Sequence, residues 1–199
     1  MRPRGCSSVA NHEISRNRHA PAPPGHADSG PIRTAGFAIR EAVSAADVES
    51  VRALLRDYMA EQGLTPGSSP RAYEDLKDLP GRYARPSGRL LLALQDGQPA
   101  GCGGLTDVPG PDGPIPGWTE MKRVYLAPAF RGLGRGRALA RTLLGQAREA
   151  GYTRVVLSTR IRWREAHAMY HSLGFRVIAP FKHKPEDMGD LQFMALDLA

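Results

Sequence analysis

The sequence predicts an α/β protein in which a mixed, mostly antiparallel sheet is flanked by helices. Short apolar segments with the two-residue period of a strand alternate with longer segments that have the period of an amphipathic helix. A strand–helix–strand unit near the middle of the chain indicates a parallel pair, and hairpins on either side indicate antiparallel pairs. The composition, 41% hydrophobic and 24% charged, is that of a globular protein.

Residues 1–36 differ in composition from the rest. They contain five prolines, five arginines and three of the six histidines, but no aromatic Phe, Trp or Tyr. Because such a segment cannot bury a core, we expect a disordered N-terminal extension over 1–36 and a single domain over 37–199. Its prolines interrupt any long targeting helix and it has no apolar signal-peptide core, so a cytoplasmic location is expected.

The domain begins with a strand over 37–41 and a helix. Ser44 and Asp47 have the spacing of a capping box, and Gly63 ends the helix. Its apolar face is formed by Val48, Val51, Leu55 and Tyr58. The turn-rich segment 64–88, with a short helical pattern over 73–79, is predicted to be a mobile connection that carries function.

A hairpin follows, with strands over 89–95 and 98–105. Asp96 and Gly97 form its turn, because this pair supplies the positive φ angles of a two-residue type I′ turn. The Pro- and Gly-rich segment 107–117 is predicted to be a loop that leads into a strand over 118–126.

The second half of the domain alternates helices and strands. A helix over 133–150 is followed by a strand over 153–158, and a second helix covers 164–173. Strands near 175–178 and 192–198 complete the chain. The predicted order is therefore β-α-α-β-β-β-α-β-α-β-β, with the helices covering the sheet.

Charge and cysteine content exclude several classes of protein. The chain has 27 basic and 20 acidic residues and a pI near 9.8, which favours an anionic ligand such as nucleic acid, acidic lipid or a phosphate-bearing cofactor. No apolar run has the ~18 residues that a membrane-spanning helix requires. Two cysteines support neither a disulfide framework nor the usual zinc site, so we expect no metal.

The turn over 131–137 carries the clearest chemical signal. It reads Arg-Gly-Leu-Gly-Arg-Gly-Arg between the end of a strand and the start of a helix. Helix-opening amides lack intrahelical acceptors, and the glycines allow a phosphate to approach the backbone. The sequence therefore predicts a phosphate or pyrophosphate site at Arg131, Gly132, Leu133, Gly134, Arg135, Gly136 and Arg137.

Two other phosphate loops do not fit this turn. A P-loop requires Lys and Ser or Thr after its last glycine, whereas Gly136 is followed by Arg137 and Ala138. A dinucleotide fingerprint requires a third glycine three residues after the second and an acidic residue ~20 positions further on, and neither is present. A nucleotide triphosphatase and an NAD-binding protein are both disfavoured.

The motif Arg131-x-x-Gly-x-Gly136, together with a second one at Ala166–Phe175, resembles the GNAT superfamily of N-acetyltransferases over nearly all of 37–199. The resemblance implies the acyl-CoA N-acyltransferase fold and acetyl-CoA as cosubstrate. It implies that the motif binds the pyrophosphate and that the preceding strand, including Val124 and Leu126, pairs with the pantetheine arm. The chain departs from the family at Trp163, where many members have a cofactor-binding asparagine.

The same resemblance suggests catalytic roles. Tyr170 lies where the family places the tyrosine that protonates the CoA sulfur, and the Val124 amide is a candidate donor to the oxyanion. Glu120 is a candidate base or amine-binding carboxylate. Packing is the alternative for Tyr170, and a surface pair with Lys122 is the alternative for Glu120.

The predicted activity is acetyl transfer to a primary amine by direct attack in a ternary complex. A CoA-binding sensor without transferase chemistry is the alternative. Nucleic acid is disfavoured as a partner because the arginines gather around the glycine turn. His167 and His171 are interpreted as a solvated helix face and Cys102 as a small buried residue. The identity of the amine acceptor is left open, and so is the choice between monomer and homodimer.

Overall fold

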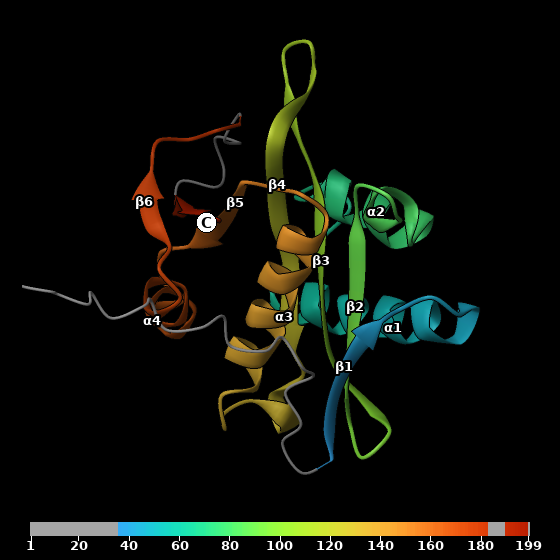
Figure 1. The fold of residues 1–199 in the computed structure, drawn as a ribbon. Coiled ribbons are helices and arrows are strands. Elements are labelled where there is room, and N and C mark those ends of the chain that lie inside the picture. Colours follow the sequence, from blue (N-terminus) through green and yellow to red (C-terminus); the bar gives the residue numbers. More distant parts are fainter. Residues whose placement is uncertain (1–35, 183–189, 199) are drawn as a thin grey trace, which may run out of the picture.

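The computed structural model describes residues 36–182 and 190–198. The predicted extension lies outside these residues except for Gly36. The described strands form one seven-stranded sheet in the order β1-β2-β3-β4-β5-β7-β6 (Figure 1). They are β1 (Phe37–Glu41), β2 (Arg89–Gln95), β3 (Gln98–Gly110), β4 (Gly113–Leu126), β5 (Arg154–Arg160), β6 (Arg176–Ile178) and β7 (Leu191–Asp197).

Helices cover both faces of this sheet. The helices are α1 (Ala45–Glu61), α2 (Pro70–Asp78), α3 (Arg135–Glu149) and α4 (Arg164–Ser172), with 3-10 turns at Gly81–Tyr83 and Pro128–Phe130. Helices α1 and α2 lie on one face, and α3 and α4 lie on the other (Figure 1). Only β4 and β5 pair in parallel within the described sheet. The predicted mixed, mostly antiparallel sheet is therefore confirmed.

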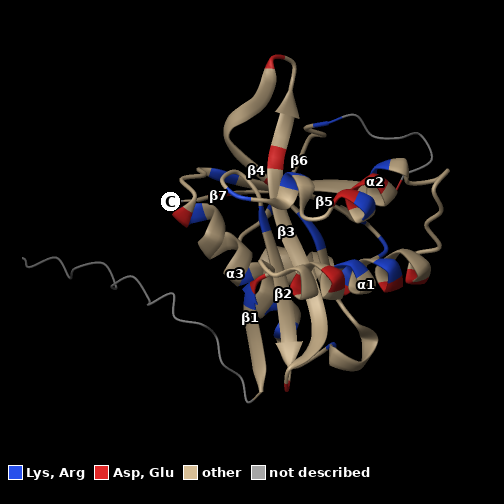
Figure 2. Ribbon diagram, turned by 90° about the vertical axis from the view of Figure 1, so that its right-hand side faces the viewer, with Lys and Arg blue, Asp and Glu red and all other residues tan. Residues whose placement is uncertain are grey.

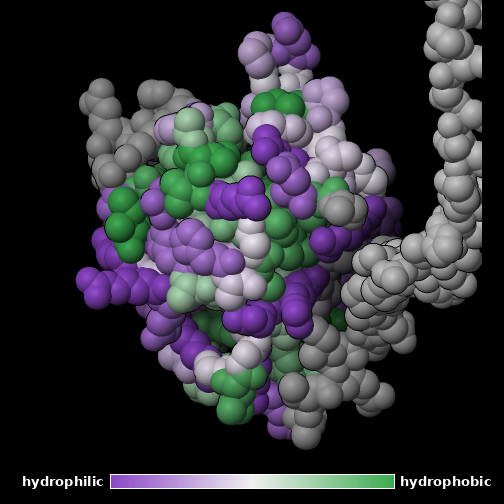
Figure 3. Space-filling model, turned by 60° about the vertical axis from the view of Figure 1, so that its left-hand side comes forward, coloured by the Kyte–Doolittle hydropathy of each residue, from purple (hydrophilic) through white to green (hydrophobic). Residues whose placement is uncertain are grey.

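The sheet alternates its side chains between two cores. Leu91, Leu105 and Leu157 pack beneath α3, whereas Leu90, Leu92 and other residues of the opposite pleat pack beneath α1. On the surface, α1 and α2 carry charges of both signs (Figure 2). The face seen in Figure 3 shows hydrophobic side chains in small groups between hydrophilic ones. Among the described helices, none is long and apolar enough to cross a membrane.

Two local predictions are confirmed. The Ser44 side chain accepts a hydrogen bond of 3.1 Å from the Asp47 amide, and the Asp47 carboxylate accepts one of 3.4 Å from the Ser44 amide, which is a complete capping box. Asp96 and Gly97 have φ angles of 50° and 81°, as a type I′ turn requires.

The predicted loop over 107–117 is wrong. Strand β3 continues to Gly110 and β4 begins at Gly113, so most of this segment is the end of a long hairpin. Pro109 and Pro114 face each other in its register. They are tolerated because β3 has no recorded pairing with β2 beyond Leu105 and β4 pairs with β5 only from Trp118, so both prolines lie on edges.

Two irregularities of β4 shape the site. Gly104 pairs with Lys122 and Cys102 with Tyr125, so two residues of β4 lie opposite one residue of β3 in a β-bulge. Arg123, at the bulge, has a φ of 57°. In addition, the pairing of β4 with β5 ends at Glu120, although β5 continues to pair with β7. Strands β4 and β5 therefore separate beyond Glu120.

Candidate active site

The glycine turn presents backbone amides at the start of α3 that have no acceptors among the described residues. Gly132, Leu133 and Gly134 have φ angles of 83°, 51° and 73°, so three successive residues lie in the left-handed region. Helix α3 begins at Arg135, two residues later than predicted, and Gly134 provides no side-chain cap. The amides of Gly136 and of the next residue have no backbone acceptor within the described chain. The turn therefore offers the geometry that an anion requires.

The arginines of the turn are held by protein groups. Arg131 forms an ion pair of 2.6 Å with Glu61 and donates a bond of 3.0 Å to the carbonyl of Leu126. Arg135 donates to the Gln95 side chain at 2.8 Å, and Arg137 donates to the Ser172 hydroxyl at 2.6 Å. These contacts fix the turn against α1, β2 and α4. A hollow of about 140 Å³ beside it is lined by Phe37, Leu133, Gly134, Arg135, Arg137, Ala138 and Arg141.

A larger cavity, of about 250 Å³, lies where β4 and β5 separate. Helices α1 and α2 contribute to its walls, as do all four residues of β4 from Glu120 to Arg123. Its lining is Tyr58, Gln62, Leu64, Ser69, Arg71, Ala72, Arg82, Pro109, Glu120, Met121, Lys122, Arg123, Ser158, Thr159, Arg160, Trp163, Lys182 and Leu191. The connection over 64–88 thus supplies part of this wall, as its predicted functional role would require.

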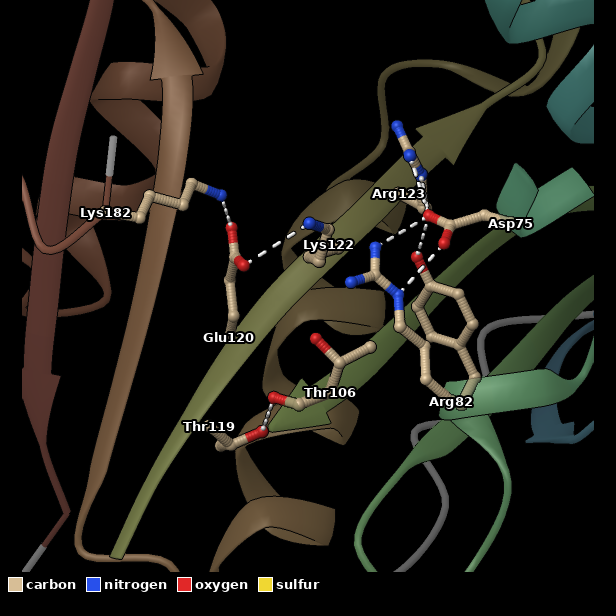
Figure 4. A network of polar contacts seen from close by, with 9 residues as sticks. Asp75, Arg82, Thr106, Thr119, Glu120, Lys122, Arg123 and Lys182 are labelled. Atoms are coloured by element: carbon tan, nitrogen blue, oxygen red, sulfur yellow. Dashed lines mark hydrogen bonds and ion pairs between the residues drawn. The ribbon is translucent and has the colours of Figure 1, made fainter. Parts of the chain in front are cut away.

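Glu120 lies in this cavity between two ammonium groups (Figure 4). Lys122 Nζ is 3.3 Å from one carboxylate oxygen, and Lys182 Nζ contacts the other. The side chain of Glu120 is only 3% exposed, so the pair with Lys122 forms but is not a surface pair. Burial raises the pKa of Glu120, but the two ammonium groups outweigh it and hold that pKa below its usual value.

The same cluster lowers the basicity of Lys122. Burial lowers the pKa of Lys122 to about 8, and the neighbouring cations Lys182, Arg82 and Arg123 act in the same direction. Glu120 opposes them without restoring the ordinary value. The pKa of the Lys122 amine therefore lies well below the ordinary lysine value.

A second carboxylate, Asp75 of α2, is shared in the same way (Figure 4). One of its oxygens accepts bonds of 2.9 Å from Arg82 and 2.7 Å from Arg123. It also accepts a 2.9 Å bond from the Tyr83 hydroxyl. Burial raises the pKa of Asp75, but the two guanidinium groups hold it below its usual value. Asp75 therefore stays ionised while two cations compete for it.

Tyr170 is buried in the core beneath α3. Its ring packs edge-on against Phe175 with the centroids 5.5 Å apart, so the packing role expected of it is present. Its hydroxyl makes no hydrogen bond to the described residues. Burial, followed by the electrostatic effect of Tyr58, raises the pKa of Tyr170 well above its ordinary value.

Trp163, the residue that departs from the family motif, immediately precedes α4 and lines the cavity. Cys102 is fully buried, and burial raises the pKa of its thiol to about 12, in keeping with the structural role expected of it. The rings of His167 and His171 lie 6.5 Å apart on α4. His167 Nε2 is 3.1 Å from the carbonyl oxygen of Arg160.

The structure brings together residues that sequence reasoning did not join. Val124 lies in the bulge and Leu126 at the end of β4, so this strand links the cavity to the glycine turn. The cations of the cavity were missed, apart from Lys122 as a strand neighbour of Glu120. They come from five separate segments, and no local pattern connects them. They are Arg71, Arg82, Lys122, Arg123, Arg160 and Lys182.

Comparisons with known proteins agree with this architecture. The model of the acetyltransferase (GNAT) family matches residues 49–175. The uncharacterised N-acetyltransferase YjgM of Escherichia coli is 32% identical over 66% of this chain and 78% of its own. A GNAT-family acetyltransferase from Staphylococcus aureus has a similar fold, with a TM-score of 0.66, 19% identity and coverage of 82% of this chain and 99% of that one.

A further structural relative is yncA of Salmonella typhimurium, which was solved with its cofactor acetyl-CoA. It has a TM-score of 0.57 and 23% identity, covering 82% of this chain and 95% of that one. The chain belongs to the GNAT family of acetyltransferases. It is accordingly an acetyl-CoA-dependent N-acetyltransferase.

Proposed function

We propose that the protein transfers the acetyl group of acetyl-CoA to a primary amine bound in the cavity between β4 and β5. The observation that carries this proposal is the course of β4. Its residues 120–123 line the cavity, and its last residue, Leu126, is tied to Arg131 of the glycine turn. A single strand therefore connects an anion site to a polar cavity.

Acetyl-CoA would bind along this strand. Its pyrophosphate would accept hydrogen bonds from amides of the glycine turn, among them those of Gly136 and Arg137. Its pantetheine arm would follow the edge of β4 at Val124 and Leu126, which do not pair with β5. The thioester would then reach the point where the two strands separate. The amide of Val124, one of the two residues of the bulge, would donate to the developing oxyanion.

The reaction needs no covalent intermediate with the protein. The neutral amine attacks the thioester carbonyl, the carbon–sulfur bond breaks, and the amine loses one proton while the thiolate gains one. Tyr170 would donate to the departing thiolate, since its raised pKa keeps the hydroxyl protonated. Because its hydroxyl makes no bond to the described residues, it can be used without breaking an existing contact.

Of the two roles considered for Glu120, we favour amine binding. A general base works best with a pKa near the pH of the reaction, whereas that of Glu120 is held below its usual value. Its carboxylate already accepts two lysine ammonium groups, which are chemical equivalents of a protonated substrate amine.

Release of free CoA thiol with a panel of amines tests the proposal. Gly134→Val is the matched variant for the cofactor site, because a β-branched residue is strained at the φ of 73° and its side chain would meet the phosphate. We expect it to lose acetyl-CoA affinity while remaining folded. Unchanged affinity would refute the anion-site assignment. If acetyl-CoA binds but no amine causes thiol release, the alternative of a CoA-binding sensor without transferase chemistry would be favoured.

A further inference from the structure

We infer that the amine acceptor carries carboxylate groups of its own, as an amino acid does, and that the cations of the cavity bind them. This inference rests on the proposed function, because it assigns the acceptor to the cavity between β4 and β5. It names the class of substrate, which the glycine turn and the fold leave undefined.

The charge balance of the cavity is the first argument. Six cationic side chains and one carboxylate line it. Asp75 and Asp190 do not line the cavity but pair with cations of its wall. With Glu120, three described carboxylates therefore face six cations. Each of two buried carboxylates is divided between two cations, since Asp75 serves Arg82 and Arg123, and Glu120 serves two lysines.

Such sharing leaves surplus positive charge on several cations that are largely buried, although Arg71 itself is exposed. The side chains of Lys122 and Arg123 are each 15% exposed, and that of Lys182 is 23% exposed. Cations desolvated to this extent gain most from a partner of opposite charge that enters the site. Repulsion among them is relieved by an anion and increased by a further cation.

Arg71 is the second argument. It lines the cavity from the first turn of α2 and makes no ion pair or hydrogen bond with any described residue. An arginine guanidinium can bind a carboxylate through two parallel hydrogen bonds. Arg71 can therefore bind a substrate carboxylate without giving up a partner among the described residues.

The arrangement also suits the reacting amine. Glu120 is the only carboxylate that lines the cavity among the described residues, and the cations surround it. An amino acid presents the complementary pattern, one ammonium group and one or more carboxylates. The surplus positive charge would lower the pKa of the bound amine, which favours the neutral form that attacks the thioester.

These charges disfavour other acceptors. A polyamine or an aminoglycoside would bring several further cations into a site with a surplus of them. A basic peptide would do the same. The proposal therefore selects a carboxylate-bearing amine from the acceptors that the sequence leaves open.

The test uses the full chain with acetyl-CoA and four acceptors, L-aspartate, L-alanine, L-alaninamide and putrescine. Alanine and alaninamide differ only in that a carboxamide replaces the carboxylate. Near neutral pH a larger fraction of the less basic amine of alaninamide is uncharged, so without binding by the cavity alaninamide would be the better acceptor. We expect kcat/KM for alanine to exceed that for alaninamide by at least about tenfold, the factor that ~1.4 kcal/mol of differential binding gives. Aspartate should equal or exceed alanine, and putrescine should be the poorest acceptor.

Variants connect this preference to the cavity. Arg71→Gln should reduce the alanine-to-alaninamide ratio without changing acetyl-CoA affinity. Lys77→Gln, an exposed residue of the same helix that does not line the cavity, is the matched control and should leave the ratio unchanged. If neither substitution changes the alanine-to-alaninamide ratio of kcat/KM, Arg71 does not bind the acceptor carboxylate.

The possible failures are distinguishable. Faster turnover of alaninamide or putrescine than of alanine and aspartate would overturn the inference and leave the acetyltransferase proposal intact. If acetyl-CoA binds but no acceptor releases thiol, the proposed function fails. Calorimetric binding of L-aspartate to the acetyl-CoA-loaded protein then decides the inference, since aspartate must still bind more tightly than putrescine.

Discussion

Lys182 contacts the carboxylate of Glu120, which lies 62 positions earlier in the chain. The contact brings the segment after β6 against β4, and Lys122 approaches the other carboxylate oxygen. Glu120 is thereby oriented by two cations from different parts of the fold. The two ammonium groups keep Glu120 ionised, and the cluster around it has an excess of positive charge.

Replacing Glu120 by Gln tests its role as an amine-binding group. The change keeps the shape of the side chain and removes its charge, so KM for the best acceptor should rise by about 10- to 100-fold, as for a lost hydrogen bond to a charged group. The acetyl-CoA KM should stay constant. Initial rates at varied acceptor concentration measure both. If instead the low-pH limb of kcat/KM flattens at constant KM, Glu120 is the base.

Tyr170→Phe tests the proposed acid. The packing on Phe175 is kept and the hydroxyl loses no hydrogen bond to a described residue, so the free energy of unfolding should change little, whereas kcat should fall by ~10²- to 10⁴-fold. Tyr152→Phe is the control, because its hydroxyl donates to the Ser87 carbonyl and to Asp107 outside the cavity. That variant should be less stable with kcat preserved. Wild-type kcat in Tyr170→Phe would indicate that solvent protonates the thiolate.

The pH dependence of acceptor binding should report Lys122. Burial lowers the pKa of Lys122 to about 8, so it is cationic below that pH and neutral above it. KM for a carboxylate-bearing acceptor should therefore rise between about pH 7 and 9 as one positive charge leaves the cavity. Lys122→Met should raise KM at pH 7 and flatten this rise. KM profiles of identical shape in both proteins would exclude Lys122 as the titrating group.

Asp75→Asn should destabilise the fold. The change leaves Arg82 and Arg123 without the charge they share, and breaking a buried ion pair typically costs ~3–5 kcal/mol. Urea denaturation measures the loss. Asp78→Asn, an exposed residue at the end of the same helix, is the control and should remain within ~0.5 kcal/mol of the parent. Comparable stability of the two variants would show that the shared pair contributes no net stability.

Acid should remove the same contribution in the unmodified protein. The pKa of Asp75 is lower in the folded protein than its ordinary value near 3.8, so the stabilisation is present above about pH 4 and is lost as pH falls through the folded pKa. Thermal unfolding of the parent should therefore show a steeper decline in Tm below pH 4 than that of Asp75→Asn.

Local rules predicted the elements whose causes lie within a few residues. The capping box at Ser44 and the turn at Asp96 are of this kind, because each depends on contacts three or fewer positions apart. The prolines of 107–117 misled the prediction, since their tolerance depends on which neighbouring strands end there. Strand edges are a property of the sheet and cannot be read from the segment itself.

The glycine turn and the cationic cavity differ in the same respect. The residues of the turn are contiguous in sequence, so a phosphate site formed by their backbone amides could be predicted from the sequence. The cavity combines residues as distant as Arg71 and Lys182, and its charge depends on which carboxylates each cation meets after folding. The bulge at Arg123 has no sequence signal of the usual kind, because a non-glycine residue occupies the left-handed position there.

The bulge at Arg123 separates the residues of β4 that line the cavity from those that pack in the two cores. In a regular strand, Lys122 and Arg123 would point to opposite faces, and one of them would enter the hydrophobic core. The additional residue allows both consecutive cations to line the cavity, while Val124 packs with the α3 core and Tyr125 with the α1 core. Substitutions at Lys122 and Arg123 would therefore change the cavity wall, and at Arg123 also the ion pair with Asp75, without placing a new side chain in either core. Deleting a single residue at the bulge would move the side chains of the rest of β4 to the opposite faces of the sheet. Both the pair of consecutive cations and the core packing of Val124 and Tyr125 would then be lost.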